Sequence, residues 1–503
     1  SIIWNLDGSG FFYKKLDEHH LPTKLYFHRL GIQSAQDQLI FHEPNPEYGM
    51  GAGRSSDRQY LLISSGNSES SETRIINLKQ DYQQQQVVFA RQDKILYGVD
   101  IAGKYIYTSI NDTGPNFRLI RTDLTSFTST KRDQWLEVIA HHDERYLVGF
   151  SLQQQYLSFT LRISGLNKLF VTEIDNLPKV QQIPFDDASY TAGCSFPTYD
   201  LPLLRVGYSS FRMPATVYEF NPATSELIHR KTAEIPSGHN PKDYVVERLY
   251  APTDDGVAVP ISLFYNKNKV NPSQAPAPLL LYGYGSYGIN IPARFSKSVL
   301  SLVDRGAIYA VAHIRGGDDL GYEWYNQTRF LGKKKTFNDF ITATKYLIEQ
   351  KYTSPKQIVI QGGSAGGMLM GAVANAAPEL YKGVVAMVPF VDVLSTMLDH
   401  MLPLTPGEYT EWGNPAASDE LYNYIASYSP YDNVKQQAYP EILVTAGLTD
   451  PRVTYWEAAK WVAKLRDYNT GNSKILLKME MGAGHFGPTG IDNELEELAE
   501  IYA

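Results

Sequence analysis

The sequence is poor in cysteine and in long apolar runs. Cys194 is the only cysteine among 503 residues, so the chain cannot form an internal disulfide or a cysteine-based metal site. Such sparing use of cysteine is typical of reducing compartments, and we therefore expect a cytoplasmic protein. No run of about 18 apolar residues is present, so we expect no membrane-spanning helix and no membrane partner.

Positive charge is also scarce. The chain has 46 Lys and Arg against 54 Asp and Glu, a formal net charge of -8, and its longest basic cluster is Lys333-Lys334-Lys335. Nucleic-acid-binding proteins usually present a basic surface, so we expect no nucleic-acid partner. The pairs His19-His20 and His141-His142 could suggest a metal site, but adjacent side chains point to opposite faces of a strand. We therefore expect no metal and no cofactor.

Aromatic residues, by contrast, are plentiful, and 35 Tyr and 21 Phe suit a large amount of β-sheet. From residue 1 to about 235 a polar turn followed by an apolar strand recurs, with markers at Phe11, Tyr60, Tyr105, Tyr146 and Leu203, which lie 49, 45, 41 and 57 residues apart. A four-stranded propeller blade needs about this length. We predict an all-β propeller domain over residues 1–238, with a β-sandwich or an irregular solenoid as alternatives.

Both ends of the chain look interrupted. It opens on Ser1-Ile2-Ile3-Trp4, which already has the pattern of a strand, and it closes on Leu498 to Ala503, inside an apolar helical pattern. We therefore expect the propeller to be N-terminally incomplete, with about five blades in this chain.

The pattern changes after Ile235 to Pro241. Tyr244 to Tyr250 and Val257 to Tyr265 predict a hairpin, and beyond it apolar strands alternate with helices. This alternation is typical of a doubly wound, mostly parallel sheet that is covered on both faces. We predict a second domain of this class over residues 239–503.

One turn in this second domain has the pattern of a nucleophile elbow. A β-branched run, Ile358-Val359-Ile360, enters Gly362-Gly363-Ser364-Ala365-Gly366, and a helix-forming segment follows. A serine lifted above the sheet needs a tight, strained turn, and the flanking glycines leave space for it. We interpret Ser364 as a catalytic nucleophile; the alternative is an ordinary glycine-rich turn.

Two further residues follow in the order that an α/β-hydrolase requires, serine then acid then histidine. Asp450 lies just after an apolar strand, and His485 lies in a glycine-rich loop after the next strand, with His400 as its only rival. We predict that His485 takes the proton of Ser364 and that Asp450 orients His485. The Ala365 N–H would supply one oxyanion donor, and the loop of residues 282–288 would supply the second.

Several motifs together resemble the oligopeptidase B branch of the prolyl oligopeptidase family of serine peptidases. The resemblance is dense over residues 240–503 and looser before them, and it rests on these segments: Tyr282 to Gly288, His313 to Gly317, Lys333 to Asp339, Gly362 to Gly367, Val388 to Val393, Glu411 to Pro415 and Tyr428 to Val434. Members of the family have a seven-bladed propeller and an α/β-hydrolase peptidase domain. The resemblance implies a serine oligopeptidase that acts as a monomer on short peptides.

The resemblance also implies roles for individual residues. It assigns the triad to Ser364, Asp450 and His485 and the second oxyanion donor to the Tyr284 hydroxyl. It assigns Glu408 to the binding of an Arg or Lys side chain before the cleaved bond, which Coulomb attraction explains. Arg452 would hold the substrate backbone, although a plain surface charge is an equal alternative.

The sequence departs from the family pattern at two places. Thr410 stands where a second glutamate is often found, and the stretch with Pro292 and Arg294 replaces one that carries two aspartates in some relatives. We therefore expect cleavage after a single basic residue and little preference for a basic pair. The triad itself would equally serve a prolyl-type oligopeptidase or an esterase, and the propeller would also suit a binding protein.

Overall fold

The computed structural model describes residues 2–17, 21–127, 132–177 and 179–503, so His19 and His20 lie outside the described residues. The chain divides into two compact units: the first comprises Ser1–Phe185, Ala192–Gly207 and Val217–Lys231, and the second comprises Asp186–Thr191, Tyr208–Thr216 and Thr232–Ala503. The boundary predicted between residues 238 and 239 stays a prediction. Among the described residues, no helix is long and apolar enough to cross a membrane.

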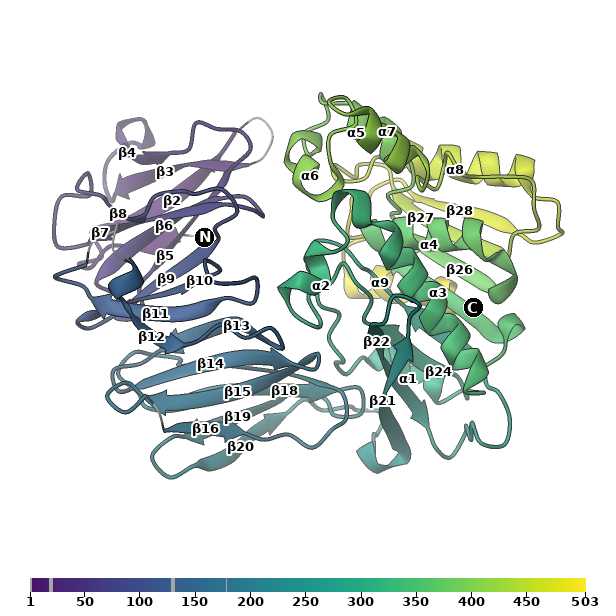
Figure 1. Cartoon of the computed structure of the whole chain (residues 1–503), viewed down its shortest axis with the longest axis horizontal. Coiled ribbons are helices and arrows are strands. Elements are labelled where there is room, and N and C mark those ends of the chain that lie inside the picture. The colour runs from purple at the N-terminus through teal and green to yellow at the C-terminus, as the bar shows by residue number, and fades with distance from the viewer. Residues whose placement is uncertain (1, 18–20, 128–131, 178) are drawn as a thin grey trace. The chain divides into compact units, whose positions relative to one another are not determined.

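The described residues of the N-terminal region form five four-stranded sheets, each built from four consecutive strands (Figure 1). In the first four sheets, every pair of neighbouring strands is antiparallel. The strands are β1(Ile2–Trp4), β2(Gly10–Leu16), β3(Pro22–Arg29), β4(Gln38–His42); β5(Gly49–Arg54), β6(Tyr60–Gly66), β7(Ser71–Asn77), β8(Gln86–Phe89); β9(Tyr97–Ala102), β10(Tyr105–Ile110), β11(Arg118–Asp123), β12(Leu136–Ile139); β13(Arg145–Leu152), β14(Tyr156–Ile163), β15(Leu166–Glu173), β16(Val180–Ile183); β17(Tyr190–Ser195), β18(Leu204–Ser210), β19(Thr216–Asn221) and β20(Glu226–Thr232).

Consecutive sheets share apolar layers. Phe12 and Leu25 of the first sheet pack with Leu61 of the second, and Val88 of the second packs with Ile106 of the third. The third and fourth sheets share another such layer. Because each strand alternates its side chains between two faces, one sheet can contact both neighbours in this way. This is the packing of propeller blades.

One of the five predicted repeat markers lies in a different strand of its sheet from the others. Phe11, Tyr60 and Tyr105 each lie in the second strand of their sheet, but Tyr146 lies in β13, the first strand of the fourth sheet. The polar turn before β13 resembles the turns that precede second strands elsewhere, which explains the error. The equivalent strand is β14, which begins at Tyr156, and the uneven steps of 41 and 57 residues come from this shift.

The second unit is organised around one eight-stranded sheet with the order β21-β22-β24-β23-β25-β26-β27-β28. The hairpin β21–β22 is antiparallel and β22 runs antiparallel to β24, whereas all pairs from β24 to β28 are parallel, as predicted. The strands are β21(Tyr244–Pro252), β22(Ala258–Asn266), β23(Leu279–Tyr282), β24(Ile308–Ala312), β25(Ile358–Gly363), β26(Gly383–Met387), β27(Glu441–Gly447) and β28(Ile475–Glu480).

Helices cover both faces of this sheet (Figure 1). Residues of α3, α4 and α8 share a core with Ile308 and Ala310 of β24, whereas residues of α1 pack with Val311, which points to the opposite face. The helices are α1(Lys297–Val303), α2(Tyr322–Asn326), α3(Lys334–Glu349), α4(Ala365–Ala376), α5(Val393–Leu398), α6(Thr405–Trp412), α7(Asp419–Ala426), α8(Tyr455–Tyr468) and α9(Ile491–Tyr502). The carboxyl ends of β25, β27 and β28 lie at one edge, and Ser364, Asp450 and His485 follow these three strands.

Candidate active site

Ser364 lies in the sharp turn between β25 and α4. Its backbone has φ 57° and ψ -121°, a strained conformation for a residue with a side chain. The Ser364 N–H donates to the Met387 carbonyl at 2.8 Å, and the Ser364 carbonyl accepts from Gly367 and Met368 at 2.9 and 3.2 Å. These bonds hold the serine at the N-terminus of α4, where partial positive charge favours an oxyanion.

The glycines on either side of Ser364 are required by close packing. A Cβ on Gly362 would lie 2.4 Å from the Gly366 carbonyl oxygen, and one on Gly366 would lie 2.9 Å from the Gly283 carbonyl oxygen. Both oxygens belong to the backbone, so they cannot move aside as the end of a flexible side chain can. The turn therefore tolerates no larger residue at these positions.

We expect Gly362→Ala to lower the free energy of unfolding by about 1–3 kcal/mol, since the added methyl group overpacks the turn. Urea denaturation followed by circular dichroism measures this change. Gly407→Ala is the matched control, because a Cβ at this helical glycine meets nothing within 4 Å, and alanine favours helix by about 0.5–1 kcal/mol. Equal stability of the two variants would contradict the close packing.

The acid and the histidine are joined by a short contact. His485 Nδ1 lies 2.7 Å from Asp450 Oδ2, and the Asp450 side chain is almost completely buried. The other carboxylate oxygen, Oδ1, accepts backbone N–H groups of Arg452 and Val453 at 2.8 and 3.1 Å. Asp450 is thus fixed on both oxygens and accepts the Nδ1–H of His485, which leaves the lone pair of Nε2 for Ser364.

The structure brings Ser364 to this pair. His485 Nε2 lies 3.2 Å from Ser364 Oγ, within hydrogen-bonding distance. The three residues thus form a continuous chain of contacts from serine to acid. His400, the rival for the role of base, is not part of it.

Two groups surround the place where an oxyanion would form. The Ala365 N–H begins α4 directly after Ser364. Burial raises the pKa of the Tyr284 hydroxyl to about 12, although Ser364 opposes this rise. The phenol therefore stays protonated at neutral pH and can donate.

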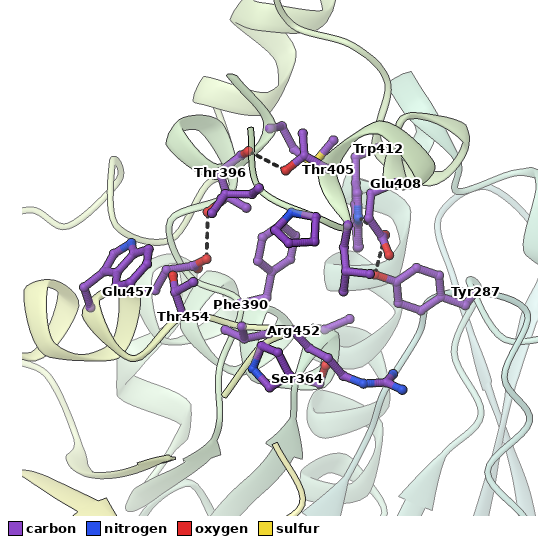
Figure 2. A pocket seen from close by; sticks show the side chains of 18 of the residues that line it. Tyr287, Ser364, Phe390, Thr396, Thr405, Glu408, Trp412, Arg452, Thr454 and Glu457 are labelled. Atoms are coloured by element: carbon purple, nitrogen blue, oxygen red, sulfur yellow. Dashed lines mark hydrogen bonds between the residues drawn. The ribbon is translucent and has the colours of Figure 1, made fainter. Parts of the chain in front are cut away.

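Ser364 opens on a cavity of about 500 Å³. Figure 2 shows Ser364 below Phe390, with Glu408 on one side of the ring and Glu457 on the other. Met397, Leu402 and other apolar residues also line this cavity. The volume is that of a pocket for a long side chain.

Glu408 supplies a carboxylate to this cavity. Its Oε2 accepts from the Tyr287 hydroxyl at 2.8 Å and from Trp412 Nε1 at 3.0 Å. Burial is the main cause that raises the pKa of the Glu408 carboxyl, Glu411 adds to it, and Arg452 opposes it. A cation that enters the cavity would favour the ionised form, because an opposite charge at short range stabilises it.

The remaining predicted residues lie at the rim or outside the cavity. Arg452 lines the cavity, is exposed and lies over the Phe486 ring, 5.4 Å from its centre. The Thr410 hydroxyl turns back to the Gly407 carbonyl at 3.2 Å, and Arg294 is exposed.

Sequence reasoning missed a buried ion pair beside the cavity. Lys333, first in the longest basic cluster, is completely buried, and its Nζ lies 3.2 Å from Glu411 Oε1. Lys334 and Lys335 are exposed, so the cluster is not one basic surface. Glu411 follows Glu408 by three residues, and this helical spacing was the only signal that could have linked the two carboxylates.

A second missed residue is Glu457, at the start of α8. Thr454 and Glu457 have the spacing of a capping box, in which each side chain would bond to the other residue's backbone N–H. Instead, Glu457 accepts from the N–H groups of Val391 and Asp392 at 3.0 and 2.9 Å and from Thr396 Oγ1 at 2.7 Å. Burial raises the pKa of the Glu457 carboxyl to about 7.

Comparisons with known proteins agree with this geometry. Residues 293–503 match the model of the prolyl oligopeptidase family, and residues 1–232 match the model of the N-terminal β-propeller domain of prolyl oligopeptidase. Protease 2 from Moraxella lacunata is 39% identical over 504 residues, which are 100% of this chain and 71% of that protein. The chain belongs to the prolyl oligopeptidase family. It is a serine-type oligopeptidase with a propeller domain and an α/β-hydrolase domain, which confirms the predicted fold class and enzyme class.

Two solved structures of the prolyl oligopeptidase family are close to the chain. Oligopeptidase B from Leishmania major has a TM-score of 0.92 and 34% identity, and the match covers 99% of this chain and 70% of that one. Oligopeptidase B from Trypanosoma brucei with covalently bound antipain has a TM-score of 0.92 and 36% identity, and the match covers 97% and 69%. The resemblance to the oligopeptidase B branch is thereby confirmed.

Proposed function

We propose that the chain cleaves short peptides after Arg or Lys through an acyl-enzyme on Ser364. One observation carries the proposal: Ser364 and the carboxylate of Glu408 line the same cavity. A basic side chain in this cavity would meet Glu408 while its carbonyl carbon lies beside Ser364. The oligopeptidase B structures support the same specificity by analogy.

The mechanism uses the contacts described above. His485 Nε2 accepts the proton of Ser364 as Oγ attacks the carbonyl carbon, and it then gives this proton to the leaving amine. Asp450 holds the histidine and stabilises the imidazolium. A water molecule activated by His485 then attacks the acyl-enzyme, which releases the carboxylic acid of the peptide product and regenerates Ser364.

Tyr284 and the Ala365 N–H would bind the oxyanion of each tetrahedral intermediate. We expect Tyr284→Phe to lower kcat by about 10²–10³-fold with little change in KM, because the phenol donates most strongly when charge develops. Steady-state kinetics on one Arg peptide measure both constants. A rise in KM at unchanged kcat would contradict the assignment.

The first experiment compares fluorogenic peptides that differ only in the residue before the scissile bond: Arg, Lys, citrulline and Pro. Citrulline is a neutral isostere of Arg, so it separates charge from shape. Preference for Arg and Lys over citrulline supports the proposal, whereas preference for Pro would move the enzyme to prolyl specificity. Labelling by a serine-directed phosphonate shows, independently of any peptide, whether Ser364 is reactive.

Glu408→Gln tests the source of the charge preference. We expect kcat/KM for the Arg peptide to fall by about 10²-fold, since the cation loses its partner, and the value for citrulline to change little. In the wild type, KM for Arg should fall as pH rises, because the carboxyl, with its raised pKa, binds a cation only when ionised. A citrulline KM with the same pH dependence would contradict this role.

Finer features of the proposal rest on sequence. With Thr410 in place of a second glutamate, and with Pro292 and Arg294 in the replaced stretch, we propose little preference for paired basic residues. We also propose a substrate-holding role for Arg452, a monomeric enzyme, a cytoplasmic location from the single cysteine, and a propeller that ends near residue 238. Equal rates on Arg peptides with Arg or Ala as the preceding residue would support the first of these.

A further inference from the structure

Lys333 is an unusual residue for the interior of a protein. It connects the short 3-10 helix Phe330–Gly332 to α3, and its side chain is completely buried. Burial lowers the pKa of its ammonium group, whereas Glu411 opposes this shift. The ammonium group also lies over the Trp412 ring, 4.7 Å from its centre. A charged side chain is rarely buried completely unless specific contacts require it, because removal of the charge from water is costly.

Two of the contacts of Lys333 lie on the loop of residues 282–288, which carries Tyr284. Its Nζ is 3.4 Å from the Gly285 carbonyl oxygen and 3.3 Å from Ser286 Oγ. These two residues directly follow Tyr284. Lys333 therefore fastens the backbone of this loop from its buried side.

The partner, Glu411, also binds this loop. Its Oε1 accepts the Tyr287 N–H at 3.1 Å, and its Oε2 accepts the Tyr325 hydroxyl at 2.5 Å. Glu411 is 2% exposed, so all these bonds form away from water. Because Glu411 belongs to α6, the pair joins the loop to the helix that carries Glu408 and Trp412.

A second contact between the same two elements lies at the cavity itself. The Tyr287 hydroxyl donates to Glu408, and the Tyr287 ring packs edge-on against Trp412, 5.7 Å between centres. Tyr287 is thus held by its backbone on Glu411 and by its side chain on Glu408. The position of Tyr284, three residues earlier, is set by the same loop.

We propose that Lys333 and Glu411 are positioning residues. They hold Tyr284, which binds the oxyanion, and Glu408, which binds the cation, at a fixed distance from each other. The inference rests on the proposed function and extends it to residues that touch no substrate. Lys333 also neutralises Glu411, so that Glu408 is the charge that a basic side chain meets. A buried ion pair is a weak source of stability, which favours such a specific role over a general one.

The charged groups around Glu408 and Glu411 decide in which direction the pKa of these carboxyls shifts when Lys333 is removed. The titratable and charged groups that interact with Glu408 or Glu411 include Tyr284, Tyr287, Tyr325, Tyr428, Lys333 and Arg452, and Arg329 lies near Tyr325 and Lys333. Removal of Lys333 leaves the buried carboxylate of Glu411, three residues from Glu408, without its ion-pair partner. Like charges at short range raise each other's pKa, so binding of a cation would then require a higher pH.

The test uses Lys333→Met, Glu411→Gln and the double variant, with Lys460→Met as control. Lys460 also pairs with a buried carboxylate, that of Asp392, but it does not contact the loop or α6. Thermal unfolding first establishes that each variant folds. We then measure kcat and KM for the Arg and citrulline peptides between pH 6 and pH 9, and the rate of phosphonate labelling.

For Lys333→Met we expect two separate effects. The kcat for both peptides and the labelling rate should fall by about 10–100-fold, because Tyr284 is displaced but not removed. The pH at which KM is halfway through its change should rise by about 0.5–1 unit for the Arg peptide, and the KM of the citrulline peptide should show no such shift. In the double variant the midpoint should return to the wild-type value while kcat stays low, since the contacts to Gly285 and Ser286 are still missing.

Three outcomes would overturn the inference. These are wild-type kcat in a folded Lys333→Met variant, a midpoint that does not move, and equal effects in Lys460→Met. The proposed specificity fails differently, through a wild type that is labelled at Ser364 but shows no preference for Arg over citrulline. In that case the labelling rates still report on the position of Tyr284, so the two failures are distinguishable.

Discussion

Ser364→Ala is expected to lower kcat for peptide hydrolysis by about 10⁵–10⁶-fold, because no other residue can form the acyl-enzyme. The contact of 3.2 Å between Ser364 Oγ and His485 Nε2 places the nucleophile directly on its base. The same variant should lose phosphonate labelling completely. Residual activity above about one part in 10³ would show that another group attacks the substrate.

The matched control is Ser364→Gly, which should be equally inactive but more stable. Ser364 has φ 57°, and glycine adopts positive φ at little cost. Relief of this strain should raise the free energy of unfolding by about 1 kcal/mol relative to Ser364→Ala. A glycine variant that is less stable than the alanine variant would contradict the presence of strain at the elbow.

Asp450→Asn is expected to lower kcat by about 10⁴-fold without unfolding the site. The backbone N–H groups of Arg452 and Val453 both point at Oδ1, so they will hold the amide oxygen there. The amide NH₂ then faces His485 Nδ1, which has to act as an acceptor. The ring proton moves to Nε2 and points at Ser364, so the histidine cannot take the serine proton.

The tautomer can be observed directly. Imidazole ¹⁵N resonances of His485 should show a protonated Nδ1 in the wild type and a protonated Nε2 in Asp450→Asn. Asp304→Asn serves as control, because Asp304 accepts from Tyr244 and Asn266 far along the chain from the triad residues. An unchanged tautomer together with a large loss of kcat would mean that charge, and not orientation, is the contribution of Asp450.

The sequence alone predicted those features in which neighbouring residues determine the backbone conformation. The glycines around Ser364, the apolar strand before it and the order of serine, acid and histidine predicted the elbow and the members of the triad. The five-fold repeat was found as well, but the phase at Tyr146 was wrong, because the polar turns before first and second strands look alike. A turn marks the start of a strand and does not say which strand of a sheet it is.

Residues whose surroundings come from distant segments could not be found in this way. Lys333 stands in a run of three lysines, and only the fold shows that it lies inside while Lys334 and Lys335 remain exposed. Its contacts are 47 residues away at Ser286 and 78 residues away at Glu411. Glu457 was missed for the opposite reason: its local spacing predicts a capping box, and tertiary contacts replace that local bond.

The bonds of Glu457 also link the cavity wall to the triad. They tie the first turn of α8, which follows Asp450, to the backbone of Val391 and Asp392 and to Thr396 on the wall. A ligand that pushes this wall outward has to stretch these bonds and will pull on the segment that holds Asp450. By linkage, any change that loosens this segment will alter the affinity of the cavity for its ligand. We therefore expect occupancy of the cavity and orientation of the general base to be thermodynamically coupled.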